Sequence, residues 1–549
     1  MTSNTSPPTT RPQWSHCGQE AKAADPVGCR GVRVHGHAVC LYHLSPGATS
    51  TYLSSVRPGD AIDHRGTLFT EPCLKELLEA LRDPATGHSH LRDAKFSEAR
   101  FIGDANFTKS RFTGATLFAK SRFTGAALFA SAEFAGLARF SGVTFESVAR
   151  FSGAKFAGDA RFDGANFTHA AHFDEATFGG PSRFGPLRAE TLDLSEAVFA
   201  APLTIEAAAQ SVLCHRTRWD AATTVRLRFA DLDLSNAVPT QPTAISAHPV
   251  PFTLGPGEAL DETPWNPATA DVRVVSLRGA DTEHLVLSDV DLQQCIFSGA
   301  FHRDQLRLEG HCVFSRTPTG LHWYPRLLPH RWSKRITLAE EHHWRASRKT
   351  SRGKRRDPGW ATAPADTTHT PRPDALAATY RQLRKGFEDT KNEPDAADFY
   401  YGEMEMRRQD TGRPWGERWL LWVYWLLSGY GLRAMRALGW LIVAVAATVF
   451  ALMLWGLPTA KLQPRTVGTL IGRDIALTTS TPAPQLTGND RITLERAQKA
   501  VIVAFNAAVF RAPSQNLTTP GTVVDMAARF IEPALLALAV LAVRGRVKR

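Results

Sequence analysis

Phenylalanine recurs along one segment of the chain at intervals that alternate strictly between five and six residues. The residue two positions before each Phe is Ala, Ser or Thr, with Val143 as the one larger exception. Each repeat therefore places a small residue and an aromatic ring on the same side of an extended backbone. The seventeen aromatic members are Phe96, Phe101, Phe107, Phe112, Phe118, Phe123, Phe129, Phe134, Phe140, Phe145, Phe151, Phe156, Phe162, Phe167, Phe173, Phe178 and Phe184.

This spacing excludes a helix and disfavours an ordinary antiparallel sheet. On a helix, steps of five and six residues scatter the rings around the axis. Nine of the Phe are followed two residues later by Gly, and each Gly would cost a helix interior roughly 1 kcal/mol. An antiparallel strand needs a period of two over several residues, whereas a turn residue follows each Phe in this segment.

The pattern predicts a solenoid with short faces, in which the small residue and the Phe point toward the axis. The chain turns at the residue after each face, where Gly is suited because it tolerates a positive φ. With four faces, one coil takes 22 residues, so that Phe96, Phe118 and Phe140 stack in one column. Neighbouring coils would be spaced at about 4.8 Å.

Two short segments, Ala105-Asn106-Phe107-Thr108 and Ala165-Asn166-Phe167-Thr168, resemble pentapeptide repeats. This resemblance implies a right-handed quadrilateral β-helix, a mainly β fold, although the six-residue steps depart from the strict five of better-known members. Looser copies of the pattern continue to about residue 314, with a Pro-rich excursion between Val238 and Pro267.

The chain as a whole is predicted to contain six regions. In order, they are an N-terminal Cys/His module at 1–50, a capping helix region at 51–90, the β-helix at 91–314 with its regular part at 91–185, a basic linker at 315–373, a helical hairpin at 374–410 and a membrane region at 411–549.

The N-terminal module contains a candidate structural zinc site made of Cys17, Cys29, Cys40 and His43. Three thiols and one imidazole form a common structural zinc set, and four protein ligands leave no position for a substrate. The spacings before Cys40 are not those of a standard finger, so small buried residues of a cap are the alternative interpretation. The helix predicted after Thr70 would cover the first coil, since a solenoid end exposes unpaired strand groups.

The predicted basic linker contains a run, Arg345 to Arg356, that has seven Lys or Arg and no acid. It is either a solvated connector or a site for anionic lipid or nucleic acid. A metal site at Glu340 to His343 is disfavoured because adjacent His residues point to different helix faces. The hairpin that follows resembles a helix pair found before the membrane part of some bacterial pentapeptide-repeat proteins. Packing or partner binding are its alternative roles.

The membrane region contains two apolar stretches long enough to cross a bilayer, at 437–457 and 523–543. Asp525, Arg529 and Glu532 interrupt the second, at spacings that allow Arg529 to pair with either acid. An aromatic interfacial segment is predicted at 415–430, and a re-entrant or amphipathic segment at 497–510.

The net charge of +11 is concentrated outside the repeats, partly beside the apolar stretches. Arg433 and Arg436 precede the first stretch and Arg544, Arg546, Lys548 and Arg549 follow the second. By the positive-inside rule, we expect a multi-pass cell-membrane protein with both termini in the cytoplasm. Seven Cys and no apolar leader at the N-terminus agree with reduced thiols or a metal site.

The sequence favours a non-enzymatic, membrane-anchored scaffold that presents its β-helix for protein contacts. No P-loop, G-x-S-x-G motif or recognisable carboxylate pair is present. The expected partners are membrane lipids, a protein of unknown identity and further copies of the same chain.

Two alternatives remain. The first is a two-span channel, which the helix, short segment, helix order resembles in outline but without a T-x-G-Y-G filter. The second is nucleic-acid or gyrase association, known for some pentapeptide-repeat proteins. It is disfavoured because DNA mimicry needs an acidic rod, while the residue before Phe is basic nine times and acidic once.

Overall fold

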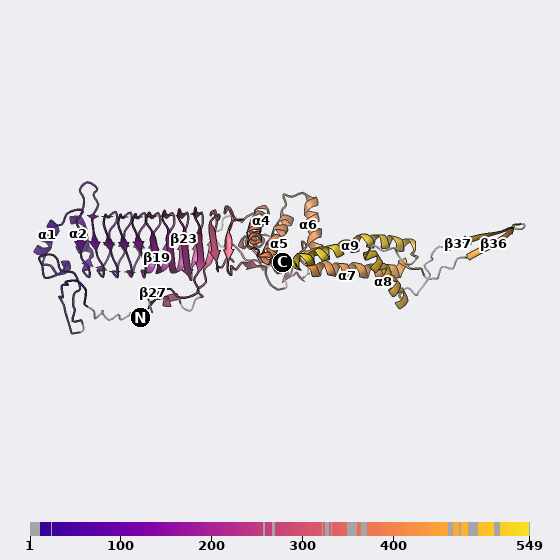
Figure 1. The fold of residues 1–549 in the computed structure, drawn as a ribbon, viewed down its shortest axis with the longest axis horizontal. Coiled ribbons are helices and arrows are strands. Elements are labelled where there is room, and N and C mark those ends of the chain that lie inside the picture. Colours follow the sequence, from indigo (N-terminus) through magenta and orange to yellow (C-terminus); the bar gives the residue numbers. More distant parts are fainter. Residues whose placement is uncertain are drawn as a thin grey trace. The chain divides into compact units, whose positions relative to one another are not determined.

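The computed structural model describes residues 11–23, 25–255, 258–265, 269–320, 322–323, 329–330, 332–348, 359–363, 370–458, 465–471, 474–480, 492–509 and 516–547. The chain forms two compact units, Met1–Asp395 and Ala396–Arg549. The first is a β-solenoid of about ten turns with a cap at each end, and the second is mainly helical (Figure 1).

The solenoid has four faces, each a ladder of parallel strands from successive coils. The first face begins with β1 (Ile62–Asp63), β4 (Ala94–Lys95), β8 (Thr116–Leu117), β12 (Ala138–Arg139) and β16 (Ala160–Arg161). The second begins with β2 (Leu68–Thr70), β5 (Arg100–Ile102), β9 (Arg122–Phe123) and β13 (Thr144–Phe145). The third begins with β6 (Ala105–Asn106), β10 (Ala127–Leu128) and β14 (Ala149–Arg150).

The fourth face is a separate sheet of two-residue strands. Its members are β3 (His90–Leu91), β7 (Arg111–Phe112), β11 (Glu133–Phe134), β15 (Lys155–Phe156), β18 (Thr177–Phe178), β20 (Val198–Phe199), β22 (Arg218–Trp219) and β25 (Val238–Pro239). The predicted solenoid with four faces is thus confirmed.

The phenylalanine rings fill the solenoid interior in columns, as predicted. All seventeen are buried. Rings one coil apart are nearly parallel, except Phe162 and Phe184, which are tilted by 30°. The centroids of Phe101 and Phe123 are 4.5 Å apart at 4°, and those of Phe118 and Phe140 are 5.2 Å apart at 7°. These are offset-stacking distances, which add a specific attraction to the burial of each ring.

Two kinds of corner account for the alternation of five and six residues. Several five-residue steps contain a turn residue in the left-handed region, such as Glu98 at φ 60° or Gly142 at φ 66°. At several six-residue steps the backbones of successive coils come close instead. A Cβ on Gly158 would lie 2.4 Å from the Gly136 carbonyl oxygen. Gly is therefore favoured by φ at some corners, as the sequence suggested, and required by space at others.

Beyond Phe184 the coils shorten from 22 to 20 residues. Ala138 pairs with Ala160, whereas Leu203 pairs with Thr223. Pro186 stands two residues after Phe184, where earlier coils have their left-handed turn residue, and a proline ring holds φ negative.

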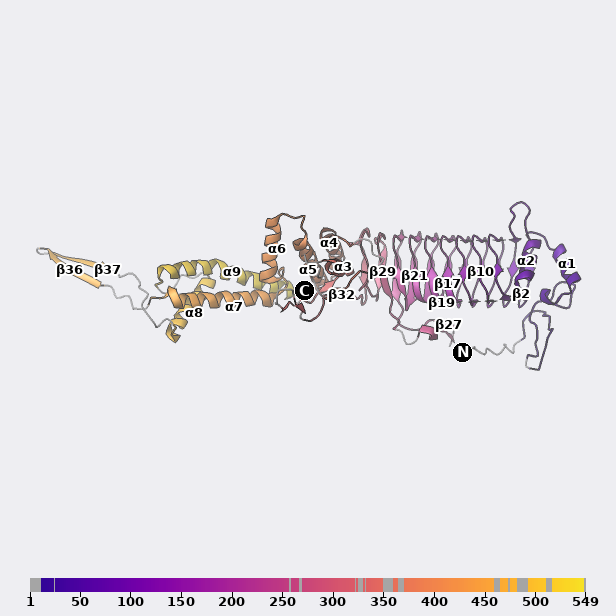
Figure 2. The ribbon, with the colours of Figure 1, turned by 180° about the vertical axis from the view of Figure 1, so that it is seen from behind.

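The chain continues there in longer strands. β19 (Ser182–Asp193) and β21 (Leu203–Leu213) run past corners, as the earlier β17 (Asn166–His172) already does (Figure 2). The later strands are shorter again: β23 (Thr223–Arg228), β24 (Asp231–Asp233), β26 (Thr243–Ala247), β29 (Arg273–Ser276), β30 (Leu285–Ser288) and β31 (Arg307–Glu309).

The Pro-rich excursion leaves the solenoid between β26 and β29 and folds back on its side. It contains β27 (Thr253–Gly255), β28 (Glu258–Ala259) and a 3-10 turn at Thr263–Trp265. Phe252, Leu260 and Trp265 pack on Ala208 of β21. Its ion pairs with the coils include Arg188–Asp261 and Arg228–Glu262, both at 3.0 Å.

The solenoid's N-terminal end is covered by η1 (Leu41–His43), α1 (Pro46–Ser55) and α2 (Glu71–Ala80). The predicted apolar side of α2 is buried through Leu74, Leu77 and Leu78.

The C-terminal end also has a folded cover, which lies inside the segment interpreted as a basic linker. It includes β32 (Ser315–Arg316), β35 (Ile336–Thr337) and α3 (Ala339–Ser347), with a small hairpin of β33 (His322–Trp323) and β34 (Pro329–His330) beside them in the sequence. In α4 (Pro373–Asp389), the first helix of the predicted hairpin, the apolar face of Leu376, Tyr380, Leu383 and Phe387 is buried. Part of 315–373 is therefore a cap, and the prediction of an extended connector is wrong there.

The second unit contains most of α5 (Glu393–Gln409) and the whole of the predicted membrane region. Its other elements are α6 (Trp415–Ser428), α7 (Ala434–Ala451) with a π-helical end at Leu452–Gly456, the hairpin β36 (Arg465–Ile471) and β37 (Asp474–Ser480), α8 (Leu494–Ala508) and α9 (Thr519–Val547). Leu452 and Met453 pack with Ala500 and Val503 of α8, and Val524 of α9 lies against them.

Candidate functional site

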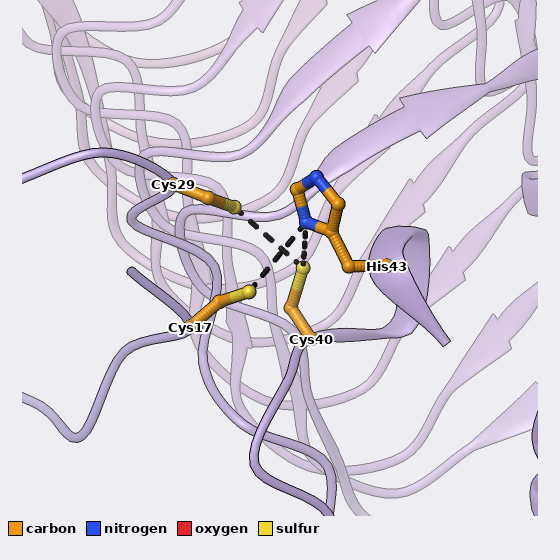
Figure 3. Close-up of side chains that lie close together, drawn as sticks. All are labelled: Cys17, Cys29, Cys40 and His43. Atoms are coloured by element: carbon orange, nitrogen blue, oxygen red, sulfur yellow. Dashed lines mark hydrogen bonds between the residues drawn. The ribbon is translucent and has the colours of Figure 1, made fainter. Parts of the chain in front are cut away.

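The four predicted metal ligands come together in the N-terminal cap (Figure 3). Sγ of Cys40 lies 3.6 Å from Sγ of Cys29 and 3.4 Å from Nδ1 of His43. Sγ of Cys17 lies 3.5 Å from the same Nδ1. All four ligand atoms lie within 4.8 Å of one another, a grouping able to hold a metal ion.

Backbone pairing explains how ligands at a non-standard spacing meet. The amide of Cys17 donates to Gly31 O at 2.8 Å, and the amide of Gly18 donates to Cys29 O at 2.8 Å. The chain from Cys17 to Gly31 thus folds back on itself. Gly31 is needed for space, because a Cβ there would lie 2.7 Å from Cys40 Cβ.

His43 is placed by the short turn that begins directly after Cys40. It closes η1, and its amide donates to Cys40 O at 3.0 Å. While Nδ1 faces the thiols, Nε2 lies 3.7 Å from a carboxylate oxygen of Glu20. A carboxylate behind a histidine ligand is a common arrangement, since it orients the ring and strengthens its donor nitrogen.

The surroundings shift the pKa values of the Cys29 and Cys40 thiols in opposite directions. The hydrogen bond between Cys29 and Cys40 lowers the pKa of Cys29 to about 5. The same contact, together with burial, raises the pKa of Cys40. Cys29 is therefore available as a thiolate at neutral pH, which is the form that binds metal.

Two further groups with metal-type side chains lie on the solenoid and were not identified from the sequence. They are His172, Asp174 and Asp193 on one hand and Asp281, Glu283 and His302 on the other. His302 Nδ1 lies 2.8 Å from Asp281 Oδ1, and the Asp281 carboxylate raises the pKa of His302. These groups have the character of surface ion pairs, and exposed acids commonly occur together without a metal.

Two helices are long and apolar enough to cross a membrane. Ala434–Gly456 has a mean hydropathy of 2.4 and Thr519–Val543 one of 1.9. Only 17% and 28% of their apolar windows are buried, whereas the core helix of a soluble protein is mostly buried. Two helices thus expose long apolar surfaces at the positions where spans were predicted.

The predicted aromatic segment forms α6, which presents large apolar side chains to the surroundings. Trp415 is 77% exposed and Leu420 63%. Trp425 instead lies under the guanidinium groups of Arg408 and Arg436, at 4.8 and 5.2 Å from its ring centroid. Exposed Trp beside Arg is typical of a helix at a membrane–water interface.

The segment predicted as re-entrant or amphipathic forms α8, which is joined to the first apolar helix by one buried arginine. Arg496 donates to the carbonyl oxygens of Met453 and Leu457, each at 2.8 Å. These carbonyls belong to the last turn before the chain leaves the helix, where orphan acceptors need donors. At the same level Gly456 and Gly521 are in close contact, since a Cβ on Gly521 would lie 2.5 Å from Gly456 O.

The three charges of the second apolar helix do not form one network. Arg529 pairs with Asp525, with Nε 2.9 Å from Oδ2. Glu532 is fully buried, and neither of its carboxylate oxygens has a hydrogen-bond partner. Of the two pairings that the spacing allowed, the structure shows the one with Asp525.

The basic residues that precede Phe face outward but do not form one stripe, because they are distributed over all four faces. Lys155 pairs with Glu133 at 3.2 Å, and Arg161 with Asp159 at 2.7 Å. In all, five of the nine pair with an acid, the other three being Arg111, Arg122 and Arg183.

The basic run at Arg345 to Arg356 is only partly described, since residues 349–356 lie outside the described residues. Arg345 is buried and bound to Glu341. The prediction that the basic run contacts lipid or nucleic acid is therefore wrong for Arg345.

Comparison with known families identifies the regular coils. The family described as pentapeptide repeats, in a form of nine copies, matches residues 87–132, 118–166 and 129–177. Comparison with curated proteins found no match, and comparison with solved structures found none. The matched residues are the coils in which the phenylalanine columns stand. Residues 87–177 of this chain thus carry pentapeptide repeats, the family that the comparison identifies there.

Proposed function

We propose that the protein is a membrane-anchored scaffold that presents a cytosolic pentapeptide-repeat solenoid for contacts with another protein and performs no catalysis. The observation that carries this proposal is the joining of a polar-faced solenoid and two exposed apolar helices in one chain. Solenoids provide long surfaces for binding. Apolar helices of this length are stable when lipid covers them.

The proposed topology has both termini in the cytoplasm and the segment between the two apolar helices outside. Arg433 and Arg436 at the start of the first helix support it, since Lys and Arg are retained on the cytoplasmic side. The test compares Lys109→Cys on the solenoid with Thr478→Cys on β37, both exposed. A membrane-impermeant maleimide on intact cells should label Cys at 478 and leave Cys at 109 unlabelled. The opposite pattern would overturn the orientation.

The partner and the assembly are addressed by crosslinking in intact membranes. We propose that copies of the chain associate through the membrane region, where Phe530 is 81% and Ile442 66% exposed. Crosslinked peptides should then join two copies within α7 or α9, while solenoid peptides should join a different protein. Recovery of the solenoid only as a monomer without crosslinks would contradict the scaffold role.

We also propose that Cys17, Cys29, Cys40 and His43 hold one structural zinc ion. The separations of 3.4 to 3.6 Å between their ligand atoms agree with the edges of a tetrahedral zinc site, about 3.5 to 3.8 Å for sulfur and nitrogen ligands. Four protein ligands close the coordination shell, so the ion would stabilise the cap without taking part in chemistry.

Elemental analysis of the purified full-length protein tests the zinc proposal. One zinc per chain is expected, and Cys40→Ser should abolish it. Cys312→Ser is the matched control, because Cys312 lies on the solenoid far from the cluster in sequence and has no role in it. A protein that folds without bound zinc would refute the site.

A two-span channel is the second candidate, favoured by α8, which packs between the apolar helices and is anchored by Arg496. Conductance of the reconstituted protein in planar bilayers would support it, provided that Glu532→Gln or Arg529→Gln changes that conductance. Bilayers that stay silent with protein present would exclude it.

A further inference from the structure

Glu532 is an acid in the interior of an apolar helix. It lies close to the midpoint of Thr519–Val543, where a spanning helix crosses the centre of the bilayer. Its side chain is 0% exposed, and both carboxylate oxygens lack a hydrogen-bond partner. An unpaired carboxylate in such a place costs several kcal/mol, so acids at this depth are neutral or bound to a cation.

The groups that face Glu532 supply little positive charge. Thr448 of α7, itself 9% exposed, is the side chain that interacts with the carboxyl group across the two helices. Asp525 is the charged group of α9 that acts on it, and that aspartate is paired with Arg529 at 2.9 Å. Between Ala437 and Gly456, the first apolar helix contains no charged residue.

The other elements packed on α9 carry their charges elsewhere. Arg496 of α8 is committed to the carbonyls of Met453 and Leu457. The charged residues of α6 and α8 are Glu417, Arg418, Glu495, Arg496 and Lys499. None of these five is among the groups that act on Glu532.

A proton suits this site better than a metal ion. Hard cations require about six oxygen ligands, whereas the polar groups that act on the Glu532 carboxyl are Thr448 and Asp525. Among the described residues, no metal-type cluster includes Glu532. A proton needs one oxygen lone pair and removes the buried charge at once.

We propose that Glu532 is a proton-binding site in the membrane region, where a protonated carboxyl group is held between α7 and α9 beside Thr448. This proposal rests on the proposed anchoring in a membrane. Binding converts the carboxylate and a proton from water into the acid, and release reverses it with no other reactant. The ionised form would draw water between the two helices, so proton occupancy controls their packing at mid-span.

The residue after Glu532 is a proline, which makes the helix backbone easier to bend at this point. Pro533 lies inside α9 and lacks the amide that would bind the carbonyl of Arg529 four residues earlier. A helix is weakened at such a position and bends there. Protonation of Glu532 therefore acts next to the weakest backbone position of α9.

The test uses the full-length protein in lipid vesicles and two carbodiimides, which react with protonated carboxyl groups. The hydrophobic dicyclohexylcarbodiimide should modify Glu532, and the label should fall as the pH is raised. The water-soluble reagent should modify Glu495, which is exposed on α8, and leave Glu532 unmodified. Mass spectrometry of peptides locates the label, so the wild-type protein itself provides the result.

Glu532→Gln should lose the hydrophobic label, and Glu495→Gln is the matched control that should keep it. Absence of the label at Glu532 at every pH, or equal labelling by both reagents, would overturn the proton site. A carbonate wash separates this outcome from failure of the anchor. Protein in the pellet without label refutes the proton site alone, whereas protein in the supernatant refutes the anchor and the proton site together.

Discussion

The two ends of the solenoid have the same task and use different chemistry for it. Each must cover bare aromatic or aliphatic side chains and the unpaired backbone groups of a terminal coil. At the N-terminal end, His64 is buried against Phe69 and Phe96, and the Cys/His cluster lies in the same cap. At the C-terminal end, Glu340 accepts a hydrogen bond from the amide of Phe297 at 2.6 Å.

The C-terminal cap is held by buried charges. Glu341 accepts from Arg335 at 2.7 Å, from Arg345 at 2.7 Å and from the Tyr380 hydroxyl at 2.6 Å. Burial alone would raise the pKa of Glu341, but the two guanidinium groups outweigh it and lower this pKa to about 2. Each end of the solenoid therefore needs a cap, but the interactions that hold the cap can differ.

The largest expected effect is the loss of the N-terminal cap on removal of the proposed zinc ion. Structural zinc contributes about 10 kcal/mol or more to the folding of small modules. Cys40→Ser should make the amides of residues 17–43 exchange rapidly with deuterium, as measured by mass spectrometry. Exchange in α3 should stay as in the wild type. Equal protection of residues 17–43 in both proteins would show that the cap needs no metal.

A somewhat smaller effect is expected from breaking the ionic cluster at the other end. Glu341→Gln leaves Arg335 and Arg345 buried beside a neutral group, and such a loss costs about 3–5 kcal/mol. Deuterium exchange should rise in α3 and α4 and remain unchanged in the N-terminal cap. An unaltered α3 would mean that apolar packing alone holds this end.

Acidification should weaken the N-terminal cap. Burial lowers the pKa of His64 to about 4 from an ordinary value of 6.5, so the folded cap excludes a proton that the unfolded chain accepts. Stability is complete above pH 6.5 and falls by about 3 kcal/mol as the pH decreases to 4. His64→Phe should flatten this dependence in exchange measurements on residues 60–70. If the pH dependence of exchange in residues 60–70 is unchanged in His64→Phe, it comes from another group.

In the C-terminal cap, Glu340 should respond to pH in the opposite direction, against His342 of the same helix, whose pKa burial lowers to about 4. Burial raises the pKa of Glu340 to about 7 from 4.5, against the hydrogen bond from Phe297 that favours the ionised form. The contribution of Glu340 to stability is complete below pH 4.5 and falls by up to about 3 kcal/mol as the pH rises to 7. Glu340→Gln keeps an acceptor for the amide and should leave α3 with the contribution of His342 alone, so the protection of α3 should rise more between pH 4.5 and 7 than in the wild type. The same pH dependence of α3 in both proteins would contradict this prediction.

The regular coils and the Cys/His cluster of the N-terminal cap were predictable because each is a pattern in the sequence. The small-x-Phe repeat places both side chains inside the solenoid. Cys17, Cys29, Cys40 and His43 are recognisable as a group because three thiols and one imidazole occur close together in the sequence. The C-terminal cap has no such pattern. Arg335 and Tyr380 are 45 residues apart, and each was assigned to a different predicted region.

The two apolar helices were likewise predictable only in part. Length and hydropathy predicted both apolar helices. The spacing of Asp525, Arg529 and Glu532 allowed two pairings, and the packing of α7 on α9 decided that Glu532 is left alone. Sequence spacing sets which side chains share a helix face, and only the neighbouring helix determines which of them lose contact with water.

By itself, the sequence determined the period, the interior residues and the existence of apolar helices, because these depend on local geometry and on the size of single side chains. How the solenoid ends are covered and which charges are buried were settled only by the tertiary structure. Those outcomes depend on contacts between residues distant in the chain, whose energies no local pattern encodes.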